Sequence, residues 1–373
     1  AIPLLVFHLT GSALSTGITY ALEILPFALV GLVGGSLADR TDRRRLMIAC
    51  DFTRFAIMAT FSIEYARGAL TLPTLYAGIV VISAAAAVFM GGQASSIPYL
   101  VGKARSSRAV AALVAAEQTS NFITPPIGGA IFAAAGALPA LIANASTYLL
   151  SQVSLIAVPT LGPDAPGAWP GLGEILRDIR SGFRFLVADA AMLSVTLASF
   201  GLNLFGLMGF SITIPYLKTV FGASDALVGV VYGGIAVGSV IGALIAGRFG
   251  PHLHFGKALC IAYLVDAVIY LPVLFAHHVV TVLVFFALSS AAGSFQTTQI
   301  IGWRIRIVPE GMVGSVFGAV RLVALIGMVP GSIAGGYLAQ LYGPRMAIIV
   351  SGVGFLLVAL YVVFSKAVRA EQR

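Results

Sequence analysis

Four ionisable side chains interrupt long apolar stretches of the sequence, and a charge is rare in such surroundings. They are Glu23, Glu117, Asp266 and Arg321. An ionised group there is costly, so these residues are functional candidates, and a carboxyl group can take up and release a proton. We expect Glu117 and Arg321 to form an ion pair that protonation of Glu117 breaks, with contact to water or substrate as the open alternative. Glu23 and Asp266 are further proton-binding candidates, and a structural partner is the alternative for Asp266.

A second candidate site is the segment 285–299, FFALSSAAGSFQTTQ, which is unusually polar for a hydrophobic stretch. In a helix, Gln296 and Gln299 share a face with Ser289 and Phe285, which lie one to three turns earlier. Such a face can offer hydrogen bonds beside apolar contacts to a bound molecule. Hydrogen bonding between neighbouring helices is the open alternative for these side chains.

Enzyme and metal signatures are absent from the sequence. It contains no GxxxxGK[ST], HExxH or GxSxG pattern. Cys50 and Cys260 lack CxxC spacing, and His252 and His254 have no further ligands nearby, so we expect no metal and no cofactor. Without a nucleotide site, any work on a substrate must draw on an ion gradient or on the substrate's own gradient.

Membrane-spanning helices must position these side chains. Of the 373 residues 59% are hydrophobic and only 10% are charged, and the mean hydropathy is +0.99. A bilayer core of about 30 Å needs about 20 apolar residues per helix. Spans are therefore predicted at 15–36, 46–66, 72–98, 109–135, 138–160, 190–217, 225–247, 257–276, 279–302, 311–339 and 344–365. Residues 1–9 are too short to cross, and we expect them to be the end of a further helix, the first of twelve.

The basic residues predict the orientation of these spans. Assigned to alternate loops, seventeen Lys and Arg residues fall on one side and only Arg67, Lys218 and Arg345 on the other. Lys and Arg accumulate on the cytoplasmic side. The formal net charge of +8 therefore reflects topology rather than nucleic-acid binding, because no soluble stretch is long enough to build a basic face. We expect a multi-pass membrane protein with both termini cytoplasmic.

The chain divides into two similar halves. An offset of 212 residues aligns Leu244–Lys257 with Leu32–Arg45, and an offset of 207 aligns the GG-x6-G pattern at Gly335 with that at Gly128. Parallel repeats of this kind place a substrate site between the halves. We predict an N-terminal helix bundle at 1–160, a linker with an amphipathic helix at 161–187 and a C-terminal bundle at 188–373.

Two motifs resemble those of the major facilitator superfamily. GSLADRTDRRR, Gly35 to Arg45, is similar to the superfamily loop between helices 2 and 3, and TPPIGG, Thr124 to Gly129, resembles the antiporter motif of helix 5, with Asn121 and Thr124 where Gly is usual. The resemblance implies an all-α fold of two six-helix bundles related by a pseudo-twofold axis. It also implies that the loop latches the halves together, with fixing topology as the alternative. The gating and motif residues are then Gly35, Asp39, Arg40, Asp42, Arg43, Arg44, Pro125, Pro126, Gly128 and Gly129, and Asp51 and Arg54 are expected to pair in support of the loop.

Helices 1, 4, 7 and 10 line the central cavity in this superfamily. The resemblance therefore adds substrate-cavity candidates on helices 4 and 7 to those of the segment 285–299: Phe89, Met90, Gln93, Asn203, Phe205 and Met208. Cues such as SGFRFL at 181–186 resemble a bacterial branch of effector, siderophore and macrolide exporters. The resemblance implies a monomeric, proton-coupled exporter of amphipathic small molecules in the lipid bilayer of a bacterial inner membrane. A nutrient importer or facilitator, a lipid or lysophospholipid flippase and a receptor without flux are the alternatives.

Overall fold

The computed structural model describes residues 2–38, 41–102, 105–158, 172–250, 253–309 and 312–371. These residues form helices joined by short turns, with no strand among them. Eight of the helices in this part of the chain are long and apolar enough to cross a membrane. The predictions of Asp39 and Arg40 as gating residues lie outside the described residues.

The helices of the N-terminal half follow the predicted spans closely. They are α1 (Ile2–Thr10), α2 (Ala13–Ala38), α3 (Arg43–Ala66), α4 (Leu72–Val101), α5 (Ser106–Ala135) and α6 (Ala137–Ile156). Residues 2–9 of the apolar stretch at 1–9 lie in the short helix α1. The beginning of α3 is fixed by Asp42, whose side chain accepts hydrogen bonds from the backbone N–H groups of Arg44 and Arg45.

The helices of the C-terminal half differ from the predicted spans at one point. They are α7 (Leu172–Ala188), α8 (Ala190–Ser211), α9 (Thr213–Phe221), α10 (Asp225–Phe249), α11 (Phe255–Leu274), α12 (Val279–Ile307), α13 (Val313–Tyr342), α14 (Pro344–Phe364) and α15 (Lys366–Ala370). The predicted span 190–217 is divided into α8 and α9 at Ile212. Gly222, with φ of 62°, then ends α9 in the left-handed conformation that suits glycine.

The helix starts show the internal repeat. Helices α2 and α3 begin 212 residues before α10 and α11, at Ala13 and Asp225 and at Arg43 and Phe255. Helices α4, α5 and α6 begin 207 residues before α12, α13 and α14. The two offsets differ because α3 has 24 residues and α11 only 20, and because the following turn is one residue longer in the first half.

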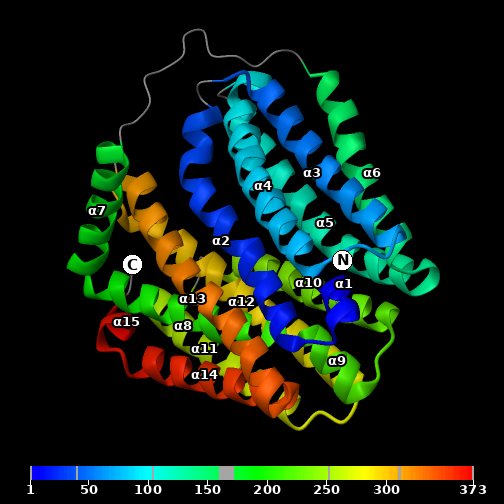
Figure 1. Ribbon diagram of the computed structural model, residues 1–373. Helices are drawn as coiled ribbons and strands as arrows, with labels where there is room; N and C mark the ends of the chain where they lie inside the picture. The colour runs from blue at the N-terminus through cyan, green and yellow to red at the C-terminus, as the bar shows by residue number, and fades with distance from the viewer. Residues whose placement is uncertain are drawn as a thin grey trace.

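The two bundles meet along two pairs of helices. In Figure 1 the helices α2 to α6, blue to bluish green, form one group, and α8 and α10 to α14, green to red, form another. Helix α2 packs on α13, and α5 packs on α10. Glycines permit close contact at one end of these pairs, which we call the Asp225 end. There a Cβ atom on Gly17 would clash with the backbone of Ser332, and one on Gly129 would lie 2.8 Å from the Gly229 Cα atom.

The amphipathic helix α7 begins the second half. Its apolar face packs on α13, where Gly182 lies against the backbone of Ser315 and Leu186 is buried. Arg177, Arg180 and Arg184 are exposed on the opposite side. The apolar face of this part of the linker therefore packs on protein, at least along α13.

Candidate functional site

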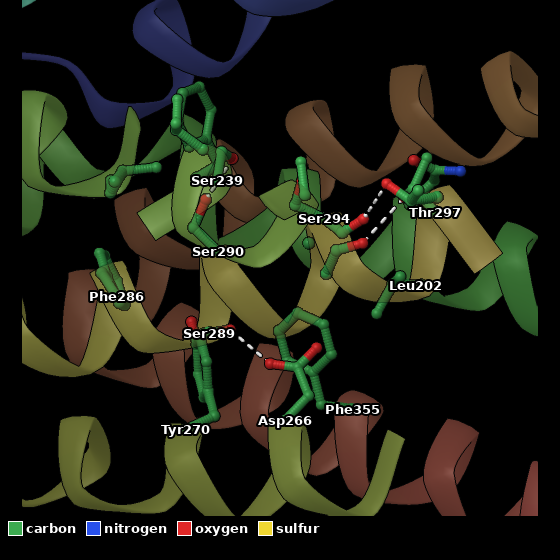
Figure 2. A pocket seen from close by; sticks show the side chains of 18 of the residues that line it. Leu202, Ser239, Asp266, Tyr270, Phe286, Ser289, Ser290, Ser294, Thr297 and Phe355 are labelled. Atoms are coloured by element: carbon green, nitrogen blue, oxygen red, sulfur yellow. Dashed lines mark hydrogen bonds between the residues drawn. The ribbon is translucent and has the colours of Figure 1, made fainter. Parts of the chain in front are cut away.

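A cavity of about 1100 Å³ lies inside the C-terminal bundle, bounded by α8, α10, α11, α12 and α14. Figure 2 shows its lining, in which aromatic rings such as Tyr270, Phe286 and Phe355 lie beside hydroxyl groups. The polar lining residues are Asn203, Ser239, Asp266, Ser289, Ser290, Ser294, Thr297 and Thr298. Asp266 is the only one of the lining residues that carries a formal charge. We call this cavity the central pocket, although all its lining residues belong to the C-terminal bundle and not to both halves, between which the repeat placed a substrate site.

The carboxyl group of Asp266 is held by two neutral donors. Ser289 Oγ donates to Asp266 Oδ1 at 2.6 Å (Figure 2), and Gln296 Nε2 donates to Oδ2 at 3.2 Å. Gln296 Nε2 also lies 3.2 Å from the Ala262 carbonyl oxygen, which ties the amide to α11. Asp266 and Gln296 are buried. The arrangement therefore supplies hydrogen bonds to the carboxyl group without supplying a positive charge from either partner.

Close packing of α10 against α12 brings further hydroxyl groups to the pocket. A Cβ atom on Gly238 or Gly242 would clash with the backbone of Ala287 or Ala291, so only glycine permits this approach. Ser239 and Ser290 share a hydrogen bond of 2.7 Å across the two helices. On α12 the Thr297 and Thr298 hydroxyl groups donate to the backbone of their own helix one turn earlier. Their oxygen lone pairs can still accept from a guest molecule.

Two of the predicted cavity residues line the central pocket, namely Asn203 and Ser289. Asn203 lies on α8, where its Nδ2 atom donates to the Ser199 carbonyl oxygen at 2.9 Å. Gln296, predicted to face a substrate, instead holds Asp266. Gln299 donates to the Ala246 carbonyl oxygen of α10 at 3.2 Å, which is the interhelical alternative considered from the sequence.

The structure places the other predicted cavity residues outside the central pocket. Phe205 packs against Gly354, Met208 is buried at the contact between α8 and α13, and Phe285 packs against the core. Phe89 lies under the Arg54 guanidinium on the face of α4 that contacts its own bundle, 4.6 Å from ring centre to Cζ. Met90 is exposed and Gln93 is half-buried.

Sequence reasoning did not identify Ser239, Ser290, Tyr270, Phe286 or Phe355 as lining residues. Ser290 and Phe286 stand in the polar segment 285–299, whose periodicity could have included them. The other three come from three different helices, and only packing brings them together.

The remaining proton-binding candidates lie on helices that face the other bundle. The Arg321 guanidinium is 5.4 Å from the ring centre of Phe27, so it contacts α2 from α13. Glu23 lies one turn after Tyr20, whose hydroxyl group forms a 2.9 Å hydrogen bond with Tyr232 of α10. The Glu117 side chain lies outside the described part of the structure, so its predicted pairing with Arg321 stays a prediction.

A polar cluster joins the two bundles at the Asp225 end. Asp225 Oδ1 lies 3.0 Å from His8 Nε2 of α1 and 2.5 Å from Lys218 Nζ of α9. The Ser12 hydroxyl group donates to Gln340 Oε1 at 3.1 Å, again across the bundles. Sequence reasoning missed this cluster because its members lie near the ends of separate helices and belong to no motif.

The described motif residues mostly stabilise the N-terminal bundle. Arg43 is buried, donates to Ser95 Oγ at 3.1 Å and lies over the Tyr99 ring. Arg44 donates to the carbonyl oxygens of Leu155 and Ile156 at the end of α6. Asp42 caps α3, as described above, while Gly35 lies in a part of α2 whose surroundings are not described.

Asp51 and Arg54 form the expected pair, with Oδ1 and Nη2 at 2.6 Å, and the Ser151 hydroxyl group donates to the second carboxylate oxygen of Asp51. In the other motif, Gly129 lies in the contact between α5 and α10, whereas a Cβ atom on Gly128 would meet open space. The side chains of Pro125 and Pro126 are outside the described residues.

The chain resembles known transporters along its whole length. A profile of the transmembrane secretion effector family of the major facilitator superfamily matches residues 1–373. An uncharacterised transporter of this superfamily, YfiS of Bacillus subtilis, is 24% identical, covering 98% of this chain and 88% of that protein. The enterobactin exporter EntS of Escherichia coli is 26% identical, covering 96% of this chain and 85% of that protein.

Solved structures confirm the fold of two related six-helix bundles. A bacterial homologue of the human lysosomal transporter Spinster, in an inward-facing conformation, superposes with a TM-score of 0.73 at 15% identity, covering 97% of this chain and 91% of that one. A bacterial homologue of the iron transporter ferroportin gives a TM-score of 0.68 at 16% identity and covers 96% of both chains. The family and these relatives are membrane transporters rather than enzymes. The chain belongs to the transmembrane secretion effector family of the major facilitator superfamily.

Proposed function

We propose that this protein is a proton-coupled exporter of amphipathic small molecules that works by alternating access. The observation that carries the proposal is the Asp266 carboxyl group beside the central pocket, buried and held by the neutral donors Ser289 and Gln296. A carboxyl group whose hydrogen-bond partners are neutral can take up and release a proton without breaking a salt bridge. Proton uptake at Asp266 would thus change the charge of the pocket itself.

The pocket lining favours a neutral or cationic cargo with both apolar and hydrogen-bonding parts. Four aromatic side chains, Phe210, Tyr270, Phe286 and Phe355, provide the apolar surface. The serine and threonine hydroxyl groups supply donors and acceptors. Asp266, as the one charged lining residue, would attract a cation and repel an anion. The name of the enterobactin exporter is consistent with a relative that moves a small molecule outward.

The contacts between the bundles support a conformation in which the Asp225 end is closed. The cross-bundle polar contacts of His8 and Ser12, and the close approach of Gly17 and Gly129, lie at the Asp225 end. The bias of basic residues makes the opposite end cytoplasmic in our proposal. The described conformation would then be closed to the outside, and loading from the cytoplasm would precede opening of the Asp225 end.

Transport in proteoliposomes tests this proposal. The purified protein is reconstituted, a pH gradient is imposed, and a panel of siderophores, cationic amphiphiles and sugars is screened for movement. We expect substrate to move against the proton flow, and a protonophore to stop it. Substrate flux in the same direction as protons would favour an importer, and flux that is independent of the pH gradient would favour a facilitator.

Asp266→Asn tests the coupling residue. The variant keeps the shape of the side chain but cannot exchange a proton, so gradient-driven accumulation should be lost while passive exchange of labelled substrate continues. Glu64→Gln is the matched control, because Glu64 is another helical carboxyl residue and does not line the pocket. Unchanged gradient-driven accumulation by Asp266→Asn would contradict the proposed role.

A further inference from the structure

A second cavity lies on the outer surface of the C-terminal bundle, between α10, α11 and α12. Its volume is about 630 Å³. Helices α10 and α11 each pack on α12, which forms the floor of the cavity through small residues such as Ala291 and Ala292. Leu253, Ile261 and Val265 of its lining are between 45% and 61% exposed, so the cavity opens outward. We call it the outer groove.

The lining of the outer groove is apolar except at one end. His254 and Lys257, both exposed, are its only residues with ionisable side chains. They stand at the beginning of α11, while Val265 and Ile269 line the groove further along the same helix. An occupant that matches this surface has a long apolar part and a negatively charged head.

The length of the groove matches one leaflet of a bilayer. Lys257 and Ile269 are 12 residues apart on α11, so they are separated by about 18 Å at 1.5 Å per residue. One half of a bilayer core of about 30 Å is close to this length. A lipid whose phosphate lies at Lys257 would therefore lay one acyl chain along the groove as far as the middle of the membrane.

We infer that the outer groove is a binding site for an anionic phospholipid, with the acyl chain between α10 and α11 and the headgroup at Lys257 and His254. The site is separate from the central pocket, since α12 presents Ser289, Ser290 and Gly293 to the pocket but Leu288, Ala291 and Ala292 to the groove. A lipid held there contacts the far side of the helix that carries Ser289. The inference does not depend on the proposed transport function.

Native mass spectrometry of the purified full-length chain tests the site. The protein is incubated with phosphatidylglycerol and phosphatidylcholine of identical acyl chains, and the retained lipids are counted. We expect preferential retention of phosphatidylglycerol. Lys257→Gln should weaken that retention about fivefold, the effect of one basic residue at an anionic surface. Lys257→Arg keeps the positive charge and should preserve the preference for phosphatidylglycerol. Loss of the preference in this variant would contradict the role of the charge even if Lys257→Gln failed to fold.

Matched controls separate the groove from general surface effects. Val265→Trp would fill the groove and should displace the lipid, whereas Val268→Trp, on an exposed position of α11 outside the lining, should not. Lys366→Gln removes another exposed cation and should have no effect. Equal retention of the two lipids by the wild type, or equal effects of the two Trp variants, would overturn the inference. So would a protein dimer that Val265→Trp dissociates, because a second copy would then occupy the groove.

Discussion

Gly129→Ala tests the contact that closes the Asp225 end. A Cβ atom at this position would lie 2.8 Å from the Gly229 Cα atom and 2.9 Å from the Asp225 carbonyl oxygen. Favourable carbon contacts begin near 3.5 Å, so α5 and α10 must separate by about 0.7 Å. The obstructing atoms belong to the backbone and cannot rotate away. Overpacking of this kind costs about 1 to 3 kcal/mol.

In the proposed alternating-access cycle that cost falls on the closed conformation alone, because the contact between α5 and α10 would be broken when the Asp225 end opens. The equilibrium should therefore shift about 5- to 150-fold toward opening. Double electron–electron resonance measures the shift with spin labels at the exposed positions Ala69 and His277, one in each bundle, after replacement of both cysteines by serine. We expect a larger population of long distances between the labels.

Gly128→Ala is the matched control for this experiment. It adds the same methyl group one residue earlier, where nothing lies within 4 Å of the new atom. Both variants lose the same backbone freedom in a helix, so the difference between them reports the contact with α10. Identical distance distributions for the two variants would refute the reasoning that this contact holds the end closed.

Three further predictions concern charged residues. Asp225→Asn removes the carboxylate that His8 and Lys218 share. Loss of a partly exposed ion pair costs about 1 kcal/mol, so opening should be favoured about fivefold, as measured with the same spin labels. Glu117→Gln should change the pH dependence of transport if Glu117 exchanges protons with its surroundings, and an unchanged pH profile would remove it as a candidate. Asp39→Asn should slow transport without reducing membrane insertion, and an unaffected transport rate would reject the latch.

The sequence predicted the helices well because apolar length and helix ends are local properties. The predicted starts at 72, 190, 225, 279 and 344 coincide with the observed starts of α4, α8, α10, α12 and α14. The division at Ile212 was not predicted, because the residues on both sides of it are equally apolar. Nothing in the local pattern marks that break, and the α9 residues Ile214, Tyr216 and Leu217 are buried against other helices.

The site was harder to predict because its chemistry depends on which face of each helix meets which neighbour. Gln296 and Ser289 were both selected for their polarity. In the structure both donate to the carboxyl group of Asp266, but only Ser289 also lines the pocket. Phe205 and Asn203 lie two residues apart on α8, yet only Asn203 lines the pocket. Sequence spacing identifies a shared face, but it does not identify what that face contacts.

The internal repeat assigns Asp266 an equivalent position in the first half. At the offset of 212 that aligns α3 with α11, Asp266 corresponds to Arg54. In the first half Arg54 is neutralised by Asp51 and lies between the Phe89 and Tyr148 rings. In the second half the equivalent position carries the opposite charge and has neutral hydrogen-bond donors as partners.

This difference between equivalent positions limits the roles that each can have. An ion pair between neighbours on one helix, such as Asp51 and Arg54, can remain intact while its bundle moves as a rigid body. A carboxyl group held by Ser289 and Gln296 can be neutral or ionised without breaking a salt bridge, because a serine hydroxyl group and an amide can rotate to serve either form. In the proposed exporter the first half would thus keep a fixed ion pair, while the second half would offer a titratable group beside the pocket.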